Sequence, residues 1–341
     1  ENGVIDAIDG NTLVIKSTDE PQTLLISYEK TVEKSFDNLL SEQAIVLTSG
    51  WHPIPDTKAR FSLTAQVPEG FTALSQSDRF DGAPVRGGFV HFSFSQPQHT
   101  MTFIAAPYVV NQRTVRDGLS VHSLFFEADK DLADGYLDAA VDYIRRYETL
   151  IGEFPYNHYV IAENIMPTGY GFPTFTLLGQ QVVRLPFIKQ TSLGHEILHS
   201  WFGNSIDIAD GSGNWCEGLT TYLADMAYRE EAGEGSAARK EAILAYHSYV
   251  NDTAANLDTF RGAGHERAAS QAQRAVGYQK SAMLFHELKQ RIGDDAFNRG
   301  LREFYQKFRG TGASWQDLRL IFERGAKMDL QRFFSERLIH N

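Results

Sequence analysis

Five consecutive residues, His195-Glu196-Ile197-Leu198-His199, restrict this chain more than any other stretch. Residues four apart lie on one face of an α-helix, so His195 and His199 can reach the same cation. Neutral imidazole is a good zinc ligand, and Glu196 is close enough to handle a water bound to that metal. Apolar side chains cover the opposite face and predict that this helix is buried in a core: Ile197, Leu198, Trp201 and Phe202. A core helix with two hydrogen-bonded histidines would look the same, so a further ligand is needed.

Glu217 is the candidate for that ligand. It lies in Trp215–Leu223, which has the pattern of a second helix. A glutamate on a helix packed beside the first one would complete a site of two histidines and one carboxylate. Such a site leaves the fourth zinc position open for water, as catalytic zinc sites do.

Three segments together, HEILHSWFGN, WCEGLTTYL and YQKS, resemble the zinc aminopeptidases of the aminopeptidase N and leukotriene hydrolase type, the gluzincins. That family carries HExxH followed by WFGN, a downstream glutamate in an N-E-G context, and a catalytic tyrosine in Y-x-K. The resemblance implies that His195, His199 and Glu217 hold one Zn²⁺ per chain. It also implies that Glu196 is the general base and Tyr278 the catalytic hydroxyl group in peptide-bond hydrolysis.

Two departures from the family pattern lie around the third ligand. Residues 200–216 are one fewer than the usual spacing, and Cys216 stands where the family has asparagine. The glycine-containing stretch 205–214 can absorb one deletion, so the predicted ligand set survives. We expect Cys216 to be a small buried side chain rather than a redox switch, since this type is usually buried.

A larger departure lies upstream of the zinc helix. There the family has a G-x-M-E-N segment, whose glutamate holds the free amine of the substrate. The corresponding segment here is 168–173, with Gly171 at the place of the glutamate. Backbone groups of this glycine-rich turn, at Gly169, Tyr170 and Gly171, are predicted to bind an extended peptide. The metal chemistry is therefore expected to carry over, whereas the amine anchor is not.

The remaining pattern predicts an α+β fold in two domains, since 341 residues exceed one ordinary core. Residues 1–116 alternate like short strands between turn signals and predict an antiparallel β-sandwich or saddle. Expected strands fall at 12–16, 24–28, 44–47, 61–67, 90–94 and 101–106. Residues 117–341 predict a thermolysin-like, mainly helical zinc metallopeptidase domain, with helices at 131–151, 237–250, 271–291 and 294–308. A capping box at Ser314 and Asp317 predicts one more helix.

Composition excludes several classes of protein. A net charge of −11 argues against nucleic-acid binding, and no apolar run is long enough to span a membrane. The start, ENGVIDAIDG, lacks the basic end and apolar core of a signal peptide and suggests a trimmed or exported chain. The compartment stays open.

The leading hypothesis is thus a zinc metallopeptidase acting on peptides, similar to an aminopeptidase but with altered recognition of the amino terminus. Two alternatives remain: an endopeptidase, and a peptide-binding module that kept the fold and lost turnover.

Overall fold

The computed structural model describes residues 5–9, 11–16, 19–167, 169–249, 256–261 and 271–339. The chain divides into two units, Glu1–Val32 and Glu33–Asn341. In the first unit, β1 (Ile5–Asp9) and β2 (Thr12–Ile15) form an antiparallel hairpin. The predicted strand at 24–28 is wrong, because this stretch pairs with no strand in the described part of the chain and Leu25 is 91% exposed.

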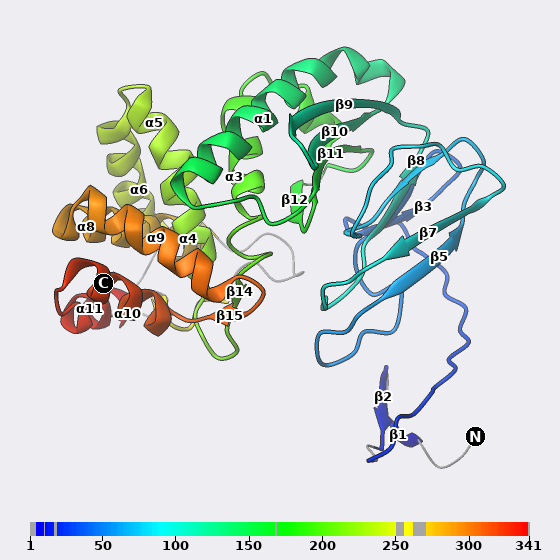
Figure 1. Ribbon diagram of the computed structural model, residues 1–341, viewed down its shortest axis with the longest axis horizontal. Coiled ribbons are helices and arrows are strands. Elements are labelled where there is room, and N and C mark those ends of the chain that lie inside the picture. The colour runs from blue at the N-terminus through cyan, green and yellow to red at the C-terminus, as the bar shows by residue number, and fades with distance from the viewer. Residues whose placement is uncertain are drawn as a thin grey trace. The chain divides into compact units, whose positions relative to one another are not determined.

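The second unit is organised on a five-stranded mixed sheet with the order β12-β13-β11-β10-β9 (Figure 1). Its strands are β9 (Val109–Arg116), β10 (Leu119–Phe125), β11 (His158–Asn164), β12 (Gly169–Phe172) and β13 (Phe175–Gly179). The strands β10, β11 and β13 are parallel, whereas β9 and β12 are antiparallel to their neighbours at the two edges. The stretch predicted as a glycine-rich turn is therefore the edge strand β12, because it pairs along its length with β13.

Each face of this sheet buries a separate apolar cluster. On one face, side chains such as Val121 and Ile161 pack against α1 (Ala133–Leu150) and the helices that follow. On the other face, Leu124 and Val160 pack against the amino-terminal strands. Burial on both faces explains why β11 is fully buried along its whole length.

The amino-terminal strands of this unit are antiparallel, as predicted. Four of them form the sheet β3-β4-β8-β6, and two more form the pair β5-β7. Their bounds are β3 (Asn38–Leu40), β4 (Ile45–Leu47), β5 (Ser62–Gln66), β6 (Thr72–Leu74), β7 (Phe89–Ser93) and β8 (Phe103–Ala106). A third apolar cluster lies between the two sets. The predicted domain boundary at residue 116 falls in the turn between β9 and β10, which pair with each other. The division into two separate domains therefore stays a prediction.

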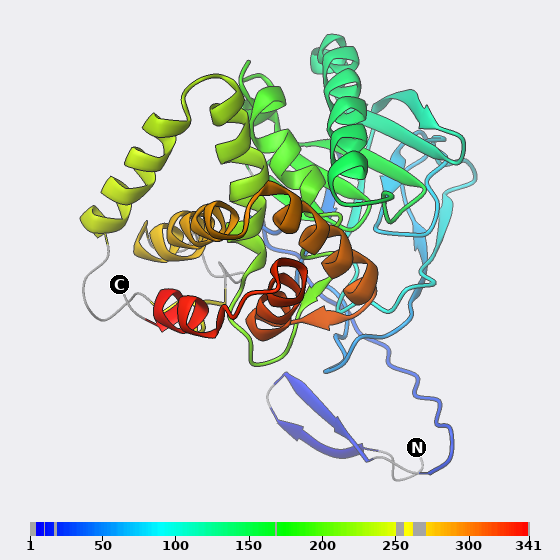
Figure 2. The ribbon, with the colours of Figure 1, turned by 60° about the vertical axis from the view of Figure 1, so that its left-hand side comes forward.

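The helices after residue 190 gather on one side of the sheet, as both ribbon views show (Figures 1 and 2). The longer ones are α3 (Ser192–Leu198), α6 (Gly235–Tyr249), α8 (Ser281–Ile292), α9 (Asp294–Phe308), α10 (Trp315–Ala326) and α11 (Gln331–Ile339). The second unit also has shorter helices, three of which precede the helices just named in the chain: η1 (Glu127–Leu132), α2 (Gln180–Val183), η2 (Ile188–Gln190), α4 (Cys216–Thr221), α5 (Ala227–Glu231) and α7 (Gln271–Arg274). Two short strands, β14 (Asp207–Ile208) and β15 (Gly312–Ala313), pair with each other. The capping box at Ser314 is confirmed.

Two π-helical segments interrupt these helices: η3 (Tyr222–Met226) joins α4 to α5, and η4 (Ala275–Lys280) joins α7 to α8. Such segments often occur at functional sites. No helix of the described ranges is both long and apolar enough to cross a membrane.

Candidate metal centre

Helix α3 carries the first two candidate ligands on one face. His195 lies within the helix, and His199 follows directly at its carboxyl end. The opposite face is buried as predicted, with Ile197 and Trp201 both 0% exposed. Close packing fixes the helix, because any Cβ at Gly194 would collide with the hydroxyl group of Tyr228. The rigid, apolar backing holds the two imidazoles in place.

Glu217 reaches the same point from the first turn of α4. A close approach between α4 and α8 sets its position, since a side chain at Gly218 would overlap Ser281. Cys216, beside the ligand, is buried, and its Sγ lies 3.4 Å from His199 Nδ1. The small buried role expected for this cysteine is therefore confirmed.

The three candidate ligands form a compact cluster. Glu217 Oε2 lies 3.5 Å from His195 Nε2 and 3.5 Å from His199 Nε2. Four-coordinate zinc with bonds of about 2.0–2.2 Å places neighbouring ligand atoms roughly 3.4 Å apart, so this spacing fits the ion. Glu217 Oε2 is moreover buried without a hydrogen-bond partner, which is costly unless a cation is bound. In the described ranges, no other group of three histidine, cysteine or acidic residues comes together in this way.

Partners behind the two imidazoles orient them for metal binding. His195 Nδ1 donates to Asp225 Oδ2 at 2.8 Å, and His199 Nδ1 donates to the carbonyl oxygen of Phe202 at 3.0 Å. Because Nδ1 carries the proton in both rings, Nε2 keeps its lone pair and faces Glu217. Both Nε2 atoms lie 3.5 Å from Glu217 Oε2, an arrangement that favours a metal site over a plain core helix.

Asp225 was missed by the sequence interpretation. Eight residues after Glu217, it would lie about 80° away from it around an ideal α-helix. The wider turn of the π-helical segment η3 turns Asp225 back toward the face of Glu217. Sequence spacing alone gave no signal for this residue.

Glu196 lies beside the edge strand β12. A Cβ at Gly171 would be 2.6 Å from Glu196 Oε2, so the glycine leaves room for this carboxylate. Burial raises the pKa of Glu196, and the nearby His195 and His199 act in the opposite direction. The carboxyl group is therefore set up to hold a proton more readily than an exposed glutamate.

Tyr278 also faces the cluster. Its ring is nearly parallel to that of His195, at 13°, with ring centres 6.3 Å apart. Burial raises the pKa of Tyr278, and the nearby Glu217 carboxylate raises it further. The phenol is therefore a proton donor at neutral pH.

The three predicted substrate contacts on β12 do not share one environment. Gly169 and Gly171 lie on the side of the strand that faces α3, with open space around Gly169. Tyr170 points the other way, because neighbouring strand residues alternate faces. Its ring packs with the apolar cluster of the amino-terminal strands, and its hydroxyl donates to Asp37 Oδ1 at 3.0 Å. The geometry thus gives no support to a substrate contact from the side chain of Tyr170.

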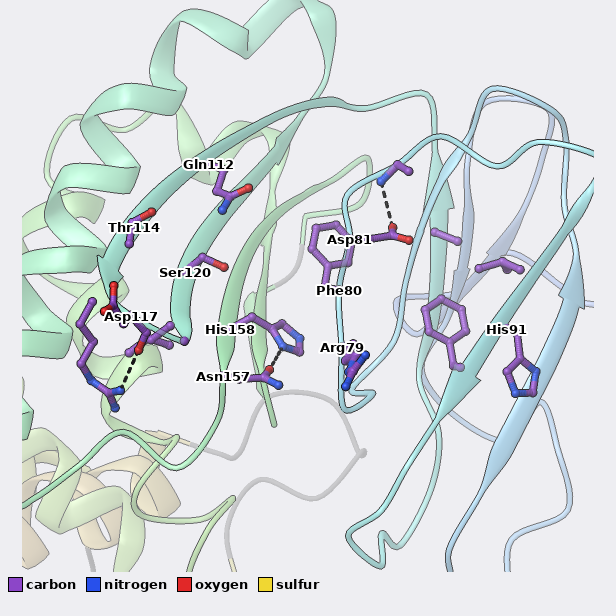
Figure 3. Close-up of a pocket in the computed structure, with 17 residues that line it drawn as sticks. Arg79, Phe80, Asp81, His91, Gln112, Thr114, Asp117, Ser120, Asn157 and His158 are labelled. Carbon is purple, nitrogen blue, oxygen red and sulfur yellow. Dashed lines mark hydrogen bonds between the residues drawn. The ribbon is translucent and has the colours of Figure 1, made fainter.

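A cavity of about 700 Å³ lies away from this cluster, where the ends of β9, β10 and β11 meet the loops around residues 79–83 (Figure 3). Phe80 and Arg79 face Ser120 and His158 across it. None of the three candidate ligands, nor Glu196 or Tyr278, lines this cavity. The candidate site is therefore identified by three ligand atoms that lie close together, and not by the presence of a large cavity.

The chain is similar to known proteins both in sequence and in structure. Residues 189–336 match the model of the peptidase family M1 domain. Aminopeptidase B of Mus musculus is 23% identical over 313 residues, which cover 85% of this chain and 46% of the relative. Alanine/arginine aminopeptidase of Saccharomyces cerevisiae is 22% identical, over 77% of this chain and 33% of the relative. The chain thus spans about half or less of the length of these relatives.

Solved structures share the fold. The M1 zinc metallopeptidase from Deinococcus radiodurans has a TM-score of 0.64 at 20% identity, over 84% of this chain and 65% of that one. Native yeast LTA4 hydrolase has a TM-score of 0.63 at 16% identity, over 84% of this chain and 47% of that one. The resemblance drawn from the three motifs is confirmed: the part of the chain that carries the cluster matches the peptidase family M1 domain, and the chain is similar to relatives named as aminopeptidases and to solved structures named as M1 zinc metallopeptidases.

Proposed function

We propose that this protein is a zinc metallopeptidase that hydrolyses peptide bonds, with His195, His199 and Glu217 as the metal ligands. The convergence of the two Nε2 atoms on the unpartnered Glu217 Oε2 carries the proposal. Relatives named as aminopeptidases support the same activity.

The bound metal, Glu196 and Tyr278 each have a separate role in the proposed reaction. Bound zinc supplies a Lewis acid that makes water a nucleophile at neutral pH and polarises the scissile carbonyl group. Glu196 accepts the proton of the attacking water and returns it to the leaving amine, a role that its raised pKa favours. Tyr278 donates its phenolic proton to the oxygen on which negative charge develops, and one such donor contributes about 3 kcal/mol.

Recognition of the substrate's amino terminus is proposed to be weak. Gly171 itself supplies no carboxylate to pair with a substrate ammonium group, which loses hydration when it enters the site. The cluster and Glu196 act on any amide that reaches them, so hydrolysis itself should persist. A blocked or longer peptide could then extend past Gly171, where the space around Gly169 is open.

The alternatives are less well supported. A binding module without turnover has no need for the full set of Glu196, Tyr278 and three ligands. An endopeptidase would require an open path on both sides of the scissile bond, and the relatives are named as aminopeptidases.

Cleavage of matched peptides with free and acetylated amino termini tests both the peptidase activity and the weak recognition of the amino terminus. We expect acetylation to reduce kcat/KM by much less than the roughly 100-fold that loss of a buried ion pair of ~3 kcal/mol implies. Mass spectrometry of the products from a mixed peptide library would show where cleavage starts, and Glu196→Gln serves as the inactive control. Strict dependence on the free amine would refute the altered recognition alone. Absence of any cleavage by zinc-loaded protein would refute the peptidase.

A further inference from the structure

The cavity between the central sheet and the loop at 79–83 has a polar floor (Figure 3). Gln112 and Thr114 line it from β9, Ser120 from β10 and His158 from β11. Ser120 pairs with Thr114 on one side and with His158 on the other, so these side chains lie on one face of the sheet. Further along, the same face is apolar and packs against the amino-terminal strands. The cavity therefore lies where this face of the sheet changes from apolar to polar.

The opposite wall of the cavity is held close to the sheet. Gly82 has a φ of +70°, and a Cβ there would lie 3.0 Å from Val110 Cγ1, so the loop requires a glycine at this position. The approach brings Phe80 next to His158, with ring centres 6.3 Å apart and ring planes at 28°. Phe80 and Phe92 thus add aromatic surface to the polar floor. The volume of about 700 Å³ lies within the range of about 300–1,000 Å³ that is typical of small-molecule sites.

The charges around this cavity do not favour an ionic ligand. Two arginines and two aspartates line it, and their formal charges cancel. One of these arginines, Arg116, is already paired with Glu148 and Glu153. Burial lowers the pKa of His158 to about 4, so this ring is neutral at pH 7. A carboxylate, phosphate or ammonium group would lose hydration here without a net opposite charge to compensate for it.

His158 offers an acceptor that a ligand can use. Its Nδ1 donates to Asn157 Oδ1 at 2.6 Å, so Nε2 of the neutral ring carries a lone pair. The side chain is 2% exposed, and no donor among the described residues reaches Nε2. A buried acceptor without a partner is costly, so a hydroxyl group of a bound molecule would stabilise this site. Phe80 lies outside the strands, and its ring can move aside to admit that hydroxyl group.

We propose that this cavity is a binding site for a small neutral saccharide. Each hydroxyl group of a sugar both donates and accepts hydrogen bonds, as do the hydroxyls of Thr114 and Ser120. The amides of Gln112 and Asn157 also offer donors and acceptors, and Phe80 supplies aromatic surface for the C–H side of a sugar ring. A wholly apolar ligand would leave these polar groups without partners. The inference is independent of the proposed peptidase function, since none of the described lining residues belongs to the metal cluster.

Titration of the wild type with neutral and charged sugars tests the class of ligand. Glucose, galactose and mannose are each compared with their uronate and their 2-amino derivative, and ligand-observed NMR reports binding. We expect saturable binding of at least one neutral hexose, and binding of its two charged derivatives that is weaker by about fivefold or more. No saturable binding of any neutral hexose, or equally tight binding of a charged derivative, would overturn the inference.

Variants then assign the binding to this cavity. Thr114→Val and Gln112→Ala change exposed side chains of the floor, and His158→Phe replaces the buried acceptor by a ring of similar shape. Each should weaken sugar binding by about fivefold, as the loss of one neutral hydrogen bond implies. Gln306→Ala is the control for Gln112→Ala, because Gln306 is exposed on α9 and does not line the cavity. Wild-type affinity in both Thr114→Val and Gln112→Ala, or an equal loss in Gln306→Ala, would refute the assignment even if His158→Phe fails to fold.

Discussion

Asp225 is expected to control how tightly the protein binds zinc. Its Oδ2 accepts from His195 Nδ1 at 2.8 Å and so fixes both the tautomer and the orientation of the ring. Without this acceptor the imidazole can rotate, and Nε2 loses part of its basicity. Residues that hold a ligand in this way typically contribute 10- to 100-fold to metal affinity.

The structure sets the expected size of the effect. The side chain of Asp225 is 38% exposed, so water can partly replace the lost oxygen. We therefore expect the lower end of the range for Asp225→Ala, about tenfold weaker zinc binding, or about 1.4 kcal/mol. Asp225→Asn keeps an amide oxygen that can accept the same proton but loses the charge. Since charge-assisted hydrogen bonds are roughly twice as strong as neutral ones, this variant should lose about threefold.

Competition against a chromophoric chelator of known affinity measures the zinc dissociation constant of each variant. Asp295→Asn is the control, because Asp295 is an exposed aspartate at the start of α9, away from the cluster. The order wild type and Asp295→Asn, then Asp225→Asn, then Asp225→Ala is expected for rising Kd. A Kd in Asp225→Ala within twofold of wild type would refute the orienting role of this carboxylate.

Three further predictions concern the site and the buried sheet. Wild-type protein should hold about one zinc per chain by elemental analysis, and His195→Ala or His199→Ala should lose it; equal zinc content in all three would exclude this ligand set. Glu196→Gln should keep zinc and abolish hydrolysis, whereas Tyr278→Phe should lower kcat more than it raises KM; full activity in Glu196→Gln would place the chemistry elsewhere. Glu163 is fully buried in β11, and burial raises its pKa to about 7. The folded state thus holds its proton more tightly than the unfolded state, so stability is lost as pH rises from about 4.5 through 7. Glu163→Gln should remove this loss, which amounts to roughly 3 kcal/mol at pH 8, and denaturant unfolding at pH 5 and pH 8 would detect it; the same pH dependence in both proteins would contradict the assignment.

The sequence by itself determined the parts of this protein that depend on local periodicity. The four-residue spacing of His195 and His199 requires only one turn of helix to bring them together. The helix α9 and the capping box at Ser314 also follow from signals within a few residues, and the structure has both where they were predicted. Glu217 needed the motif resemblance as well, because nothing in its own segment shows what it packs against.

The tertiary structure decided whatever depends on partners distant in the chain. Residues 24–28 have the composition of a strand but form no strand pairing with the other described residues, whereas the glycine-rich stretch 169–172 becomes a strand because β13 lies beside it. Asp225 reaches His195 only through the π-helical turn, whose extra residue cannot be seen in side-chain spacing. The contact between Gly171 and Glu196 joins a strand edge to a helix. Such pairings are set by packing between elements, and the sequence of one element does not contain the position of the other.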